Sequence, residues 1–100
     1  MQLEKNRRGR ELRVVLSGEL DHHNAAIICE EVDRELDGSV KLLTLDMSGI
    51  TFMDSSGIGV VLGRYRRMSE SGGKLRMGGM SIYAEKILRM AGVLALLERK

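Results

Sequence analysis

The chain has 100 residues, of which 43% are hydrophobic and 30% charged, so residues 1–100 are enough for one small globular domain and too few for two. The formal net charge of +2 is too small to indicate a nucleic-acid partner, and a lone cysteine excludes an intrachain disulfide and a cysteine metal cluster. No apolar run approaches the ~20 residues of a membrane-spanning helix and the polar N-terminus lacks a signal-peptide pattern, so we expect a cytoplasmic protein that does not contact a membrane.

The first part of the chain predicts a hairpin, a helix and a central strand. Residues 2–6 and 11–17 form the predicted hairpin, and the second segment alternates apolar and polar residues with the period of a half-buried strand. A loop over residues 18–24 leads into a helix over 25–36, whose apolar residues recur at spacings of three and four. Residues 40–47 are almost all apolar, as expected of a central strand covered on both faces.

The second part predicts two further helices and two short strands. A helix from Ser55 or Ser56 to Ser69 is followed by two glycines that end it, and a strand covers residues 74–77. A third helix, capped by Ser81, reaches residue 90, and residues 93–97 predict a last strand. The residues of the second helix that we expect to face the sheet are Ile58, Val61, Leu62, Tyr65 and Met68.

The order strand, helix, strand over residues 11–47 favours a right-handed crossover between two parallel strands. The carboxyl ends of parallel strands lie at the same edge of a sheet. We therefore expect the segment at residues 18–23 and the loop that carries Ser56 to be neighbours and to form one surface.

The stretch at residues 51–65 places an aspartate and two serines where the central strand gives way to a helix. A helix start has unpaired backbone N–H groups and a partial positive charge, which suit a phosphate, so Ser56 is the candidate phosphoacceptor. A simpler interpretation is that Asp54 or Ser55 only caps the helix.

Two interpretations of this stretch as an enzyme site fit its residues less well. A hydrolase elbow needs glycine two residues before and after its serine, but Asp54 and Ile58 occupy those positions around Ser56. The glycines at 57, 59 and 63 are spaced one residue too long for a dinucleotide loop. Such glycines instead remove side chains from a helix surface, which is typical of a docking surface.

The segment Asp21-His22-His23 also has alternative interpretations. A metal site or a catalytic base is possible in principle, but the chain has no further histidine, and adjacent residues seldom converge on one ion. Asp21 or Asn24 can cap the next helix. Contact with a partner is the third reading.

The run FMDSSGIGVVLGRY at residues 52–65, together with GELDHH at residues 18–23, resembles the STAS-domain anti-anti-sigma factors, above all their sporulation-type members. The resemblance extends from about residue 12 to residue 97. It implies an α/β fold, a small mixed β-sheet with helices packed chiefly on one face. Relatives commonly continue into a closing helix beyond the position of Lys100, so the resemblance leaves the C-terminal packing open.

The resemblance also implies a function. The unphosphorylated protein would bind an anti-sigma factor serine kinase, which carries the ATP or ADP, and so release a sigma factor. Phosphorylation of Ser56 would end binding, and a serine phosphatase would restore it. The protein would be no enzyme and would hold no cofactor or metal of its own. Expected partner contacts are Asp21, His22, Asp54, Ser55, Gly57, Ile58 and Arg64.

Three alternatives stay open at this point. The same fold could serve a general stress-response sigma factor, or it could be an unregulated STAS interaction scaffold. A hydrolase that uses Ser56 with His22 as base is the enzyme alternative.

Overall fold

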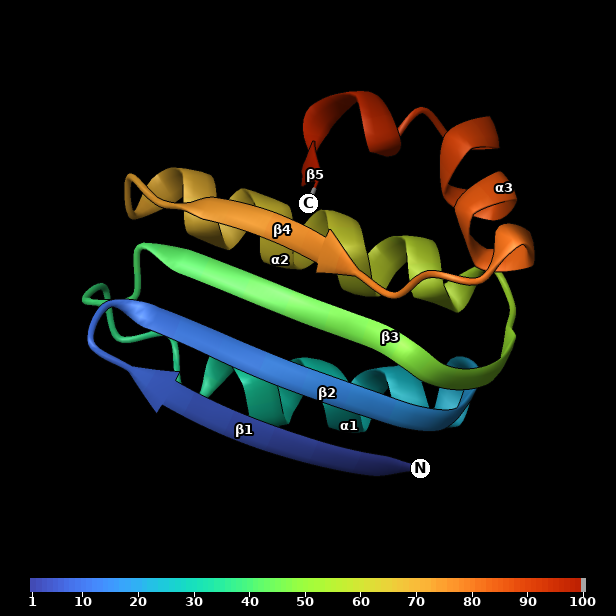
Figure 1. Cartoon of the computed structure of the whole chain (residues 1–100), viewed down its shortest axis with the longest axis horizontal. Coiled ribbons are helices and arrows are strands. Elements are labelled where there is room, and N and C mark those ends of the chain that lie inside the picture. Colours follow the sequence, from blue (N-terminus) through green and yellow to red (C-terminus); the bar gives the residue numbers. More distant parts are fainter. Residues whose placement is uncertain (100) are drawn as a thin grey trace.

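The computed structural model describes residues 1–99 and contains one mixed sheet with three α-helices (Figure 1). The strands are adjacent in chain order, β1-β2-β3-β4-β5; β1 runs antiparallel to β2, and the remaining neighbours are parallel. The strands are β1 (Gln2–Arg8), β2 (Glu11–Leu20), β3 (Leu42–Met53), β4 (Lys74–Gly78) and β5 (Glu98–Arg99). The helices are α1 (His22–Asp33), α2 (Ser56–Glu70), α3 (Ile82–Met90) and the short 3₁₀ helix η1 (Leu94–Leu96).

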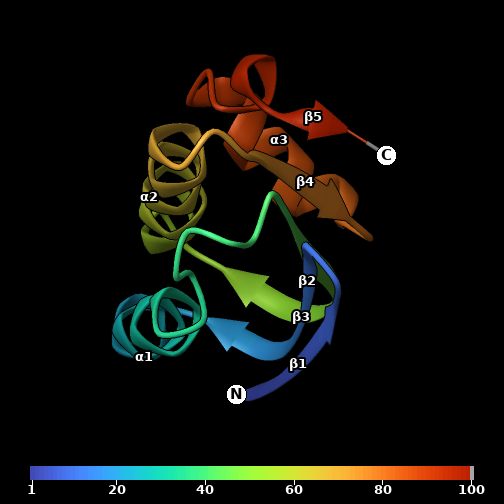
Figure 2. The same cartoon turned by 90° about the vertical axis from the view of Figure 1, so that its left-hand side faces the viewer.

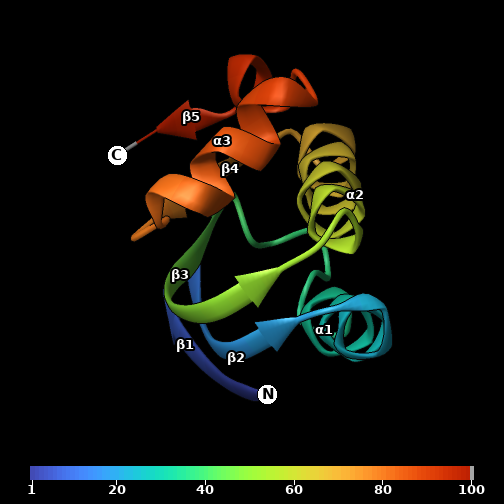
Figure 3. The same cartoon turned by 90° about the vertical axis from the view of Figure 1, so that its right-hand side faces the viewer.

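Helices α1 and α2 lie side by side on one face of the sheet, as Figures 2 and 3 show from opposite ends. Their apolar sides and the inward residues of the strands form the buried core, which follows the predicted strand alternation and the helical spacing. The predicted α/β class, with a mixed sheet and helices chiefly on one face, is confirmed. Core residues from these elements include Leu12, Val14, Leu16, Ile28, Val32, Leu43, Leu45, Met47, Val61 and Met68.

Strand β3 is longer than the predicted segment, because it continues past Met47 to Met53. Its partner β2 likewise extends beyond residue 17 to Leu20, and the register between the two strands shifts near Ser17. Gly49 permits this close pairing, since a Cβ atom there would lie 2.6 Å from the Cβ atom of Ser17. Residues predicted as loop therefore extend the sheet toward the Ser56 edge.

Helix α1 is displaced from its predicted range. It begins at His22 because the Asp21 side chain caps it, three residues before the expected start. It ends at Asp33, where the hydrogen bonds change to the tighter spacing of a 3₁₀ turn: the N–H of Glu35 donates to Val32, and that of Leu36 donates to Asp33. The expected loop over residues 18–24 is consequently half strand and half helix.

The predicted strand over residues 93–97 is wrong. The N–H of Leu96 donates to the carbonyl of Val93 at 3.0 Å and that of Leu97 to Leu94 at 3.3 Å, which closes the turns of η1. The chain becomes extended only at β5, beside β4. The sequence expectation about a closing helix after Lys100 concerns a part of the chain outside the described residues.

The predicted helix ends in the second half are close to those observed. Ser81 caps α3 and accepts a hydrogen bond from the N–H of Ala84 at 3.0 Å. Gly72 follows α2 with a φ of +78°, which glycine adopts at little cost. Within the described part of the chain, no helix has both the length and the apolar character to cross a membrane.

Candidate functional site

The carboxyl ends of β2 and β3 lie together and carry the two sequence motifs. Leu20 pairs with Met53 in the parallel register, and the N–H of Asp54 donates to the carbonyl of Leu20 at 3.3 Å. Asp21 and Asp54 therefore follow neighbouring strand ends, and α1 and α2 both begin at this edge (Figure 3). The predicted proximity of the two segments is confirmed.

Asp21 is held in place by the start of α1. Its Oδ1 atom accepts a hydrogen bond from the N–H of Asn24 at 2.9 Å, and the Asn24 amide donates to the carbonyl of Glu19 at 2.8 Å. Asp21 is thus the cap, and Asn24 secures the end of β2. His22 and His23 are exposed in the first turn of α1, and no group of three metal-ligating side chains occurs among the described residues.

Asp54 organises the start of α2. Its Oδ1 atom accepts a hydrogen bond from the N–H of Ser56 at 2.8 Å, and its carbonyl accepts one from Gly57 at 3.1 Å. One orphan N–H group of the helix start is therefore satisfied by Asp54 and not by a serine hydroxyl. Of the two capping candidates considered from the sequence, Asp54 provides the side-chain contact.

The two serines contribute no hydroxyl to this arrangement. Ser55 occupies the N-cap position in helical conformation without a side-chain cap, and Ser56 is the first residue of α2. Among the described residues, neither hydroxyl has a hydrogen-bond partner. Ser55 is exposed and Ser56 is half-buried. A hydroxyl that stabilises nothing in the fold is free to be modified without loss of a structural contact.

Gly57 and Ile58 point to the interior rather than to the surface. Gly57 is buried, and a Cβ atom on it would lie 2.5 Å from the Sδ atom of Met53. Ile58 is half-buried and packs on the core. Of the three glycines on α2, Gly59 and Gly63 have open surroundings. They lie one turn apart, and a Cβ atom on either would meet nothing within 4 Å.

Arg64 lies inside the molecule between the two helices. It is 7% exposed, and its Nε atom lies 2.9 Å from Oδ1 of Asp33 on α1, an ion pair without the alignment of a hydrogen bond. Arg67 approaches the same carboxylate at 3.4 Å. Arg64 therefore joins α1 to α2 instead of facing a partner. Asp33 had no distinguishing sequence signal, because its role depends on the contact between the helices.

Exposed apolar side chains border the same edge, a feature that sequence reasoning missed. Phe52, just before the site, is 45% exposed, and Tyr83, at the start of α3, is 57% exposed. Both line a shallow pocket of about 280 Å³. Only the packing of α3 against the end of β3 brings them together, so neither residue is marked by the periodicity of its own segment.

Comparison with known proteins gives consistent matches to this fold. The anti-sigma F factor antagonist of Paenibacillus polymyxa is 33% identical over 94 residues, which is 93% of this chain and 80% of that protein. The solved structure of the anti-sigma factor antagonist SpoIIAA in its unphosphorylated form has a TM-score of 0.82 at 25% identity, covering 99% of this chain and 88% of that one.

A second solved structure, the Bacillus cell fate determinant SpoIIAA in the phosphorylated form, has a TM-score of 0.79 at 26% identity and covers 99% of this chain and 91% of that chain. The family model that describes the STAS domain matches residues 2–99. With its mixed sheet and the two helix starts gathered at one edge, the chain belongs to the STAS domain family.

Proposed function

We propose that this protein is an anti-sigma factor antagonist whose partner is an anti-sigma factor with serine kinase activity. The unphosphorylated protein binds that kinase, together with the ATP or ADP bound to it, and the sigma factor is released. The kinase then transfers phosphate to Ser56, which ends binding until a serine phosphatase removes it. The protein acts by binding and performs no catalysis itself.

The single observation that supports this proposal best is the state of Ser56. Its hydroxyl has no hydrogen-bond partner among the described residues, while its backbone N–H is fixed by Asp54 at 2.8 Å. The serine is thus presented in a defined position with an available hydroxyl, at the positive end of a helix of 15 residues. The relatives are anti-sigma factor antagonists, and one of them was solved in a phosphorylated form, which favours phosphate as the modification.

The surface around Ser56 is suited to a docked partner. Asp21 lies on the neighbouring strand end, and Gly59 leaves a bare patch on α2 that a second backbone can approach. Phe52 and Tyr83 add exposed apolar area beside these polar groups. Exposed aromatic side chains together with fixed polar groups are the composition expected of a binding surface.

Phosphate on Ser56 would act by obstructing this surface rather than by refolding the domain. Negative charge at a helix start is stabilising by about 0.3–1 kcal/mol, so the local structure has little reason to melt. Reversing binding from nearly complete to nearly absent takes about 5.5 kcal/mol. Covering a dianion that has no cationic partner costs several kcal/mol, and the carboxylates of Asp54 and Asp21 add like-charge repulsion.

The test is phosphorylation by candidate anti-sigma kinases with ATP, followed by mapping of the modified residue. Ser56→Ala should abolish phosphate incorporation and leave kinase binding intact. Ser55→Ala is the matched control, since it removes the neighbouring hydroxyl, which is also without a partner among the described residues. Phosphate incorporated at the wild-type rate in Ser56→Ala would assign the acceptor to Ser55. Absence of binding to every anti-sigma kinase would refute the function itself.

A further inference from the structure

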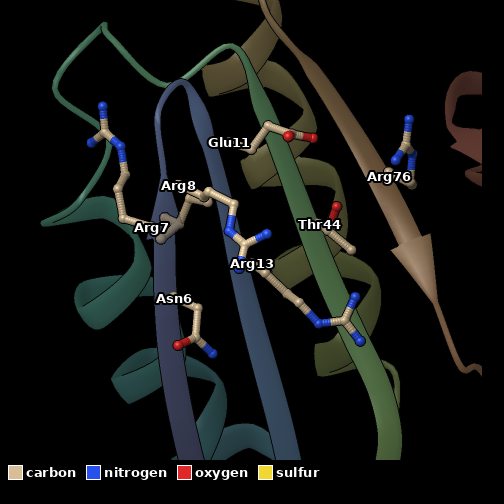
Figure 4. A pocket seen from close by; sticks show the side chains of 8 residues that line it. Asn6, Arg7, Arg8, Glu11, Arg13, Thr44 and Arg76 are labelled. Atoms are coloured by element: carbon tan, nitrogen blue, oxygen red, sulfur yellow. The ribbon is translucent and has the colours of Figure 1, made fainter.

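The face of the sheet opposite α1 and α2 carries a row of polar side chains that crosses four strands. Asn6 on β1 pairs with Arg13 on β2, Arg13 with Thr44 on β3, and Thr44 with Arg76 on β4. Neighbouring strands are about 4.8 Å apart, so the two arginines flank the threonine at similar spacing on either side. Figure 4 shows Arg13 and Thr44 on this face, with Arg76 on the adjoining strand.

Thr44 forms the floor of a pocket of about 590 Å³ on this face. The residue is 8% exposed, and no hydrogen bond from its hydroxyl is found in the described part of the chain. The hydroxyl is not among the side-chain atoms sealed from solvent without a partner, so it opens to the pocket and can donate to a ligand there. The pocket that Thr44 lines is of the size that small ligands occupy.

The charges that line the pocket are mainly positive. Arg8, Arg13 and Arg76 contribute cations, and Glu11 is the acidic residue of the lining. Among the described side chains, Arg8 and Arg76 form no ion pair. Arg7 also borders the pocket, but its guanidinium points away from the row in Figure 4 and donates to the Gly9 carbonyl and the Ser39 hydroxyl.

Arg13 on β2 is held in place by an acidic side chain on the neighbouring strand β3. Asp46, which is 8% exposed, forms an ion pair with Arg13. The other carboxylate oxygen of Asp46 accepts hydrogen bonds from the backbone N–H of Ser48 at 2.9 Å and from its hydroxyl at 2.7 Å. Arg13 thus has a fixed position, and its guanidinium has further N–H groups to offer a ligand.

We propose that this face binds a phosphate group, held between Arg13 and Arg76 above the Thr44 hydroxyl. Guanidinium groups match phosphate oxygens with paired N–H donors. A tetrahedral oxyanion can meet donors from three directions at once, whereas a planar carboxylate has oxygens for two. The ligand is free phosphate or the phosphate monoester of a small molecule.

This site is separate from the Ser56 edge. Arg13 and Thr44 are the third residues of β2 and β3, whereas Ser56 follows the opposite end of β3. The row also lies on the face of the sheet that α1 and α2 leave open (Figures 2 and 4). Binding of phosphate here is therefore independent of the proposed partner and of modification at Ser56.

The experiment is a titration of the ¹⁵N-labelled protein with inorganic phosphate, glycerol phosphate and sodium acetate in separate arms, at constant ionic strength. We expect saturable amide shifts at residues 13, 44 and 76 with at least one phosphate compound, and none with acetate. Saturation by inorganic phosphate identifies the free ion as sufficient, and saturation by glycerol phosphate alone identifies a monoester.

Three variants locate the site. Arg76→Gln should weaken binding about tenfold, because a charge-assisted contact is lost. Thr44→Val should also weaken it, and it should not lower the unfolding midpoint, since the hydroxyl has no partner among the described residues. Arg66→Gln removes an exposed arginine of α2 and should change nothing.

Shifts that rise linearly with phosphate, saturation by acetate, or equal weakening in Arg66→Gln and Arg76→Gln would overturn the assignment, because each result indicates diffuse charge attraction without a site.

Discussion

Replacing Gly57 by alanine inserts a methyl group against the core beneath the Ser56 turn. The new Cβ atom would lie 2.5 Å from Sδ and 2.6 Å from Cγ of Met53, and 3.2 Å from Cδ2 of Leu20. Both side chains are fully buried in a close-packed interior, so neither has free space. Overpacking costs about 1–3 kcal/mol and better helix propensity offsets at most about 1 kcal/mol, so we expect a net loss of about 1–2 kcal/mol.

Gly59→Ala is the matched control, since it lies two residues further along the same helix and its Cβ atom would meet nothing within 4 Å. It should stabilise the protein by about 0.4–1 kcal/mol. The assay is urea unfolding of both variants, supported by thermal midpoints, which shift about 4–8 °C per kcal/mol in a domain of this size. Equal changes of the same sign in the two variants would refute the packing account of Gly57.

Three further predictions concern helix α1 and its contacts. Asp21→Ala should destabilise the protein by ~1 kcal/mol through loss of a helix cap, and it should also weaken kinase binding. Ser81→Ala is the control, because it removes a comparable cap on α3. An equal loss of kinase affinity in both variants would contradict a contact role for Asp21. Arg64→Leu should destabilise by about 1–3 kcal/mol in urea unfolding, because the Asp33 carboxylate loses its buried cation and keeps only the more exposed Arg67. An unchanged midpoint would contradict this. Hydrogen bonding to Lys5 lowers the pKa of Glu31 from its usual 4.5. The contribution of this carboxylate to folding stability is therefore present above pH 4.5 and is lost as the pH falls through the lowered pKa. Glu31→Gln should flatten the acid side of the plot of stability against pH, and an unchanged plot would contradict this.

Much of the fold could be predicted because it depends on local periodicity and on one topological rule. The alternation in β2 placed Leu12, Val14 and Leu16 on the buried face, and the strand–helix–strand order gave the parallel pairing. The same rule brought Asp21 to the Ser56 edge. These inferences needed no knowledge of how distant side chains meet.

The features that were missed depend on tertiary contacts. The burial of Arg64 requires Asp33 on another helix, and the register shift at Gly49 requires the approach of β2. The end of α1 depends on a change from α to 3₁₀ hydrogen bonding over the last turn, which residue spacing does not specify. Thr44 appeared only as one residue of an apolar strand, since its position between two arginines follows from pairing across the sheet.

The proposed switch at Ser56 is tested most directly by measuring kinase affinity and amide spectra on the same protein with and without phosphate on that residue. We expect affinity to collapse while the amide shifts stay confined to residues 54–59 and 18–23, as obstruction of a docking surface requires. Unchanged affinity after stoichiometric phosphorylation, or shifts that spread through the central strand β3 and into helix α3, would contradict this account.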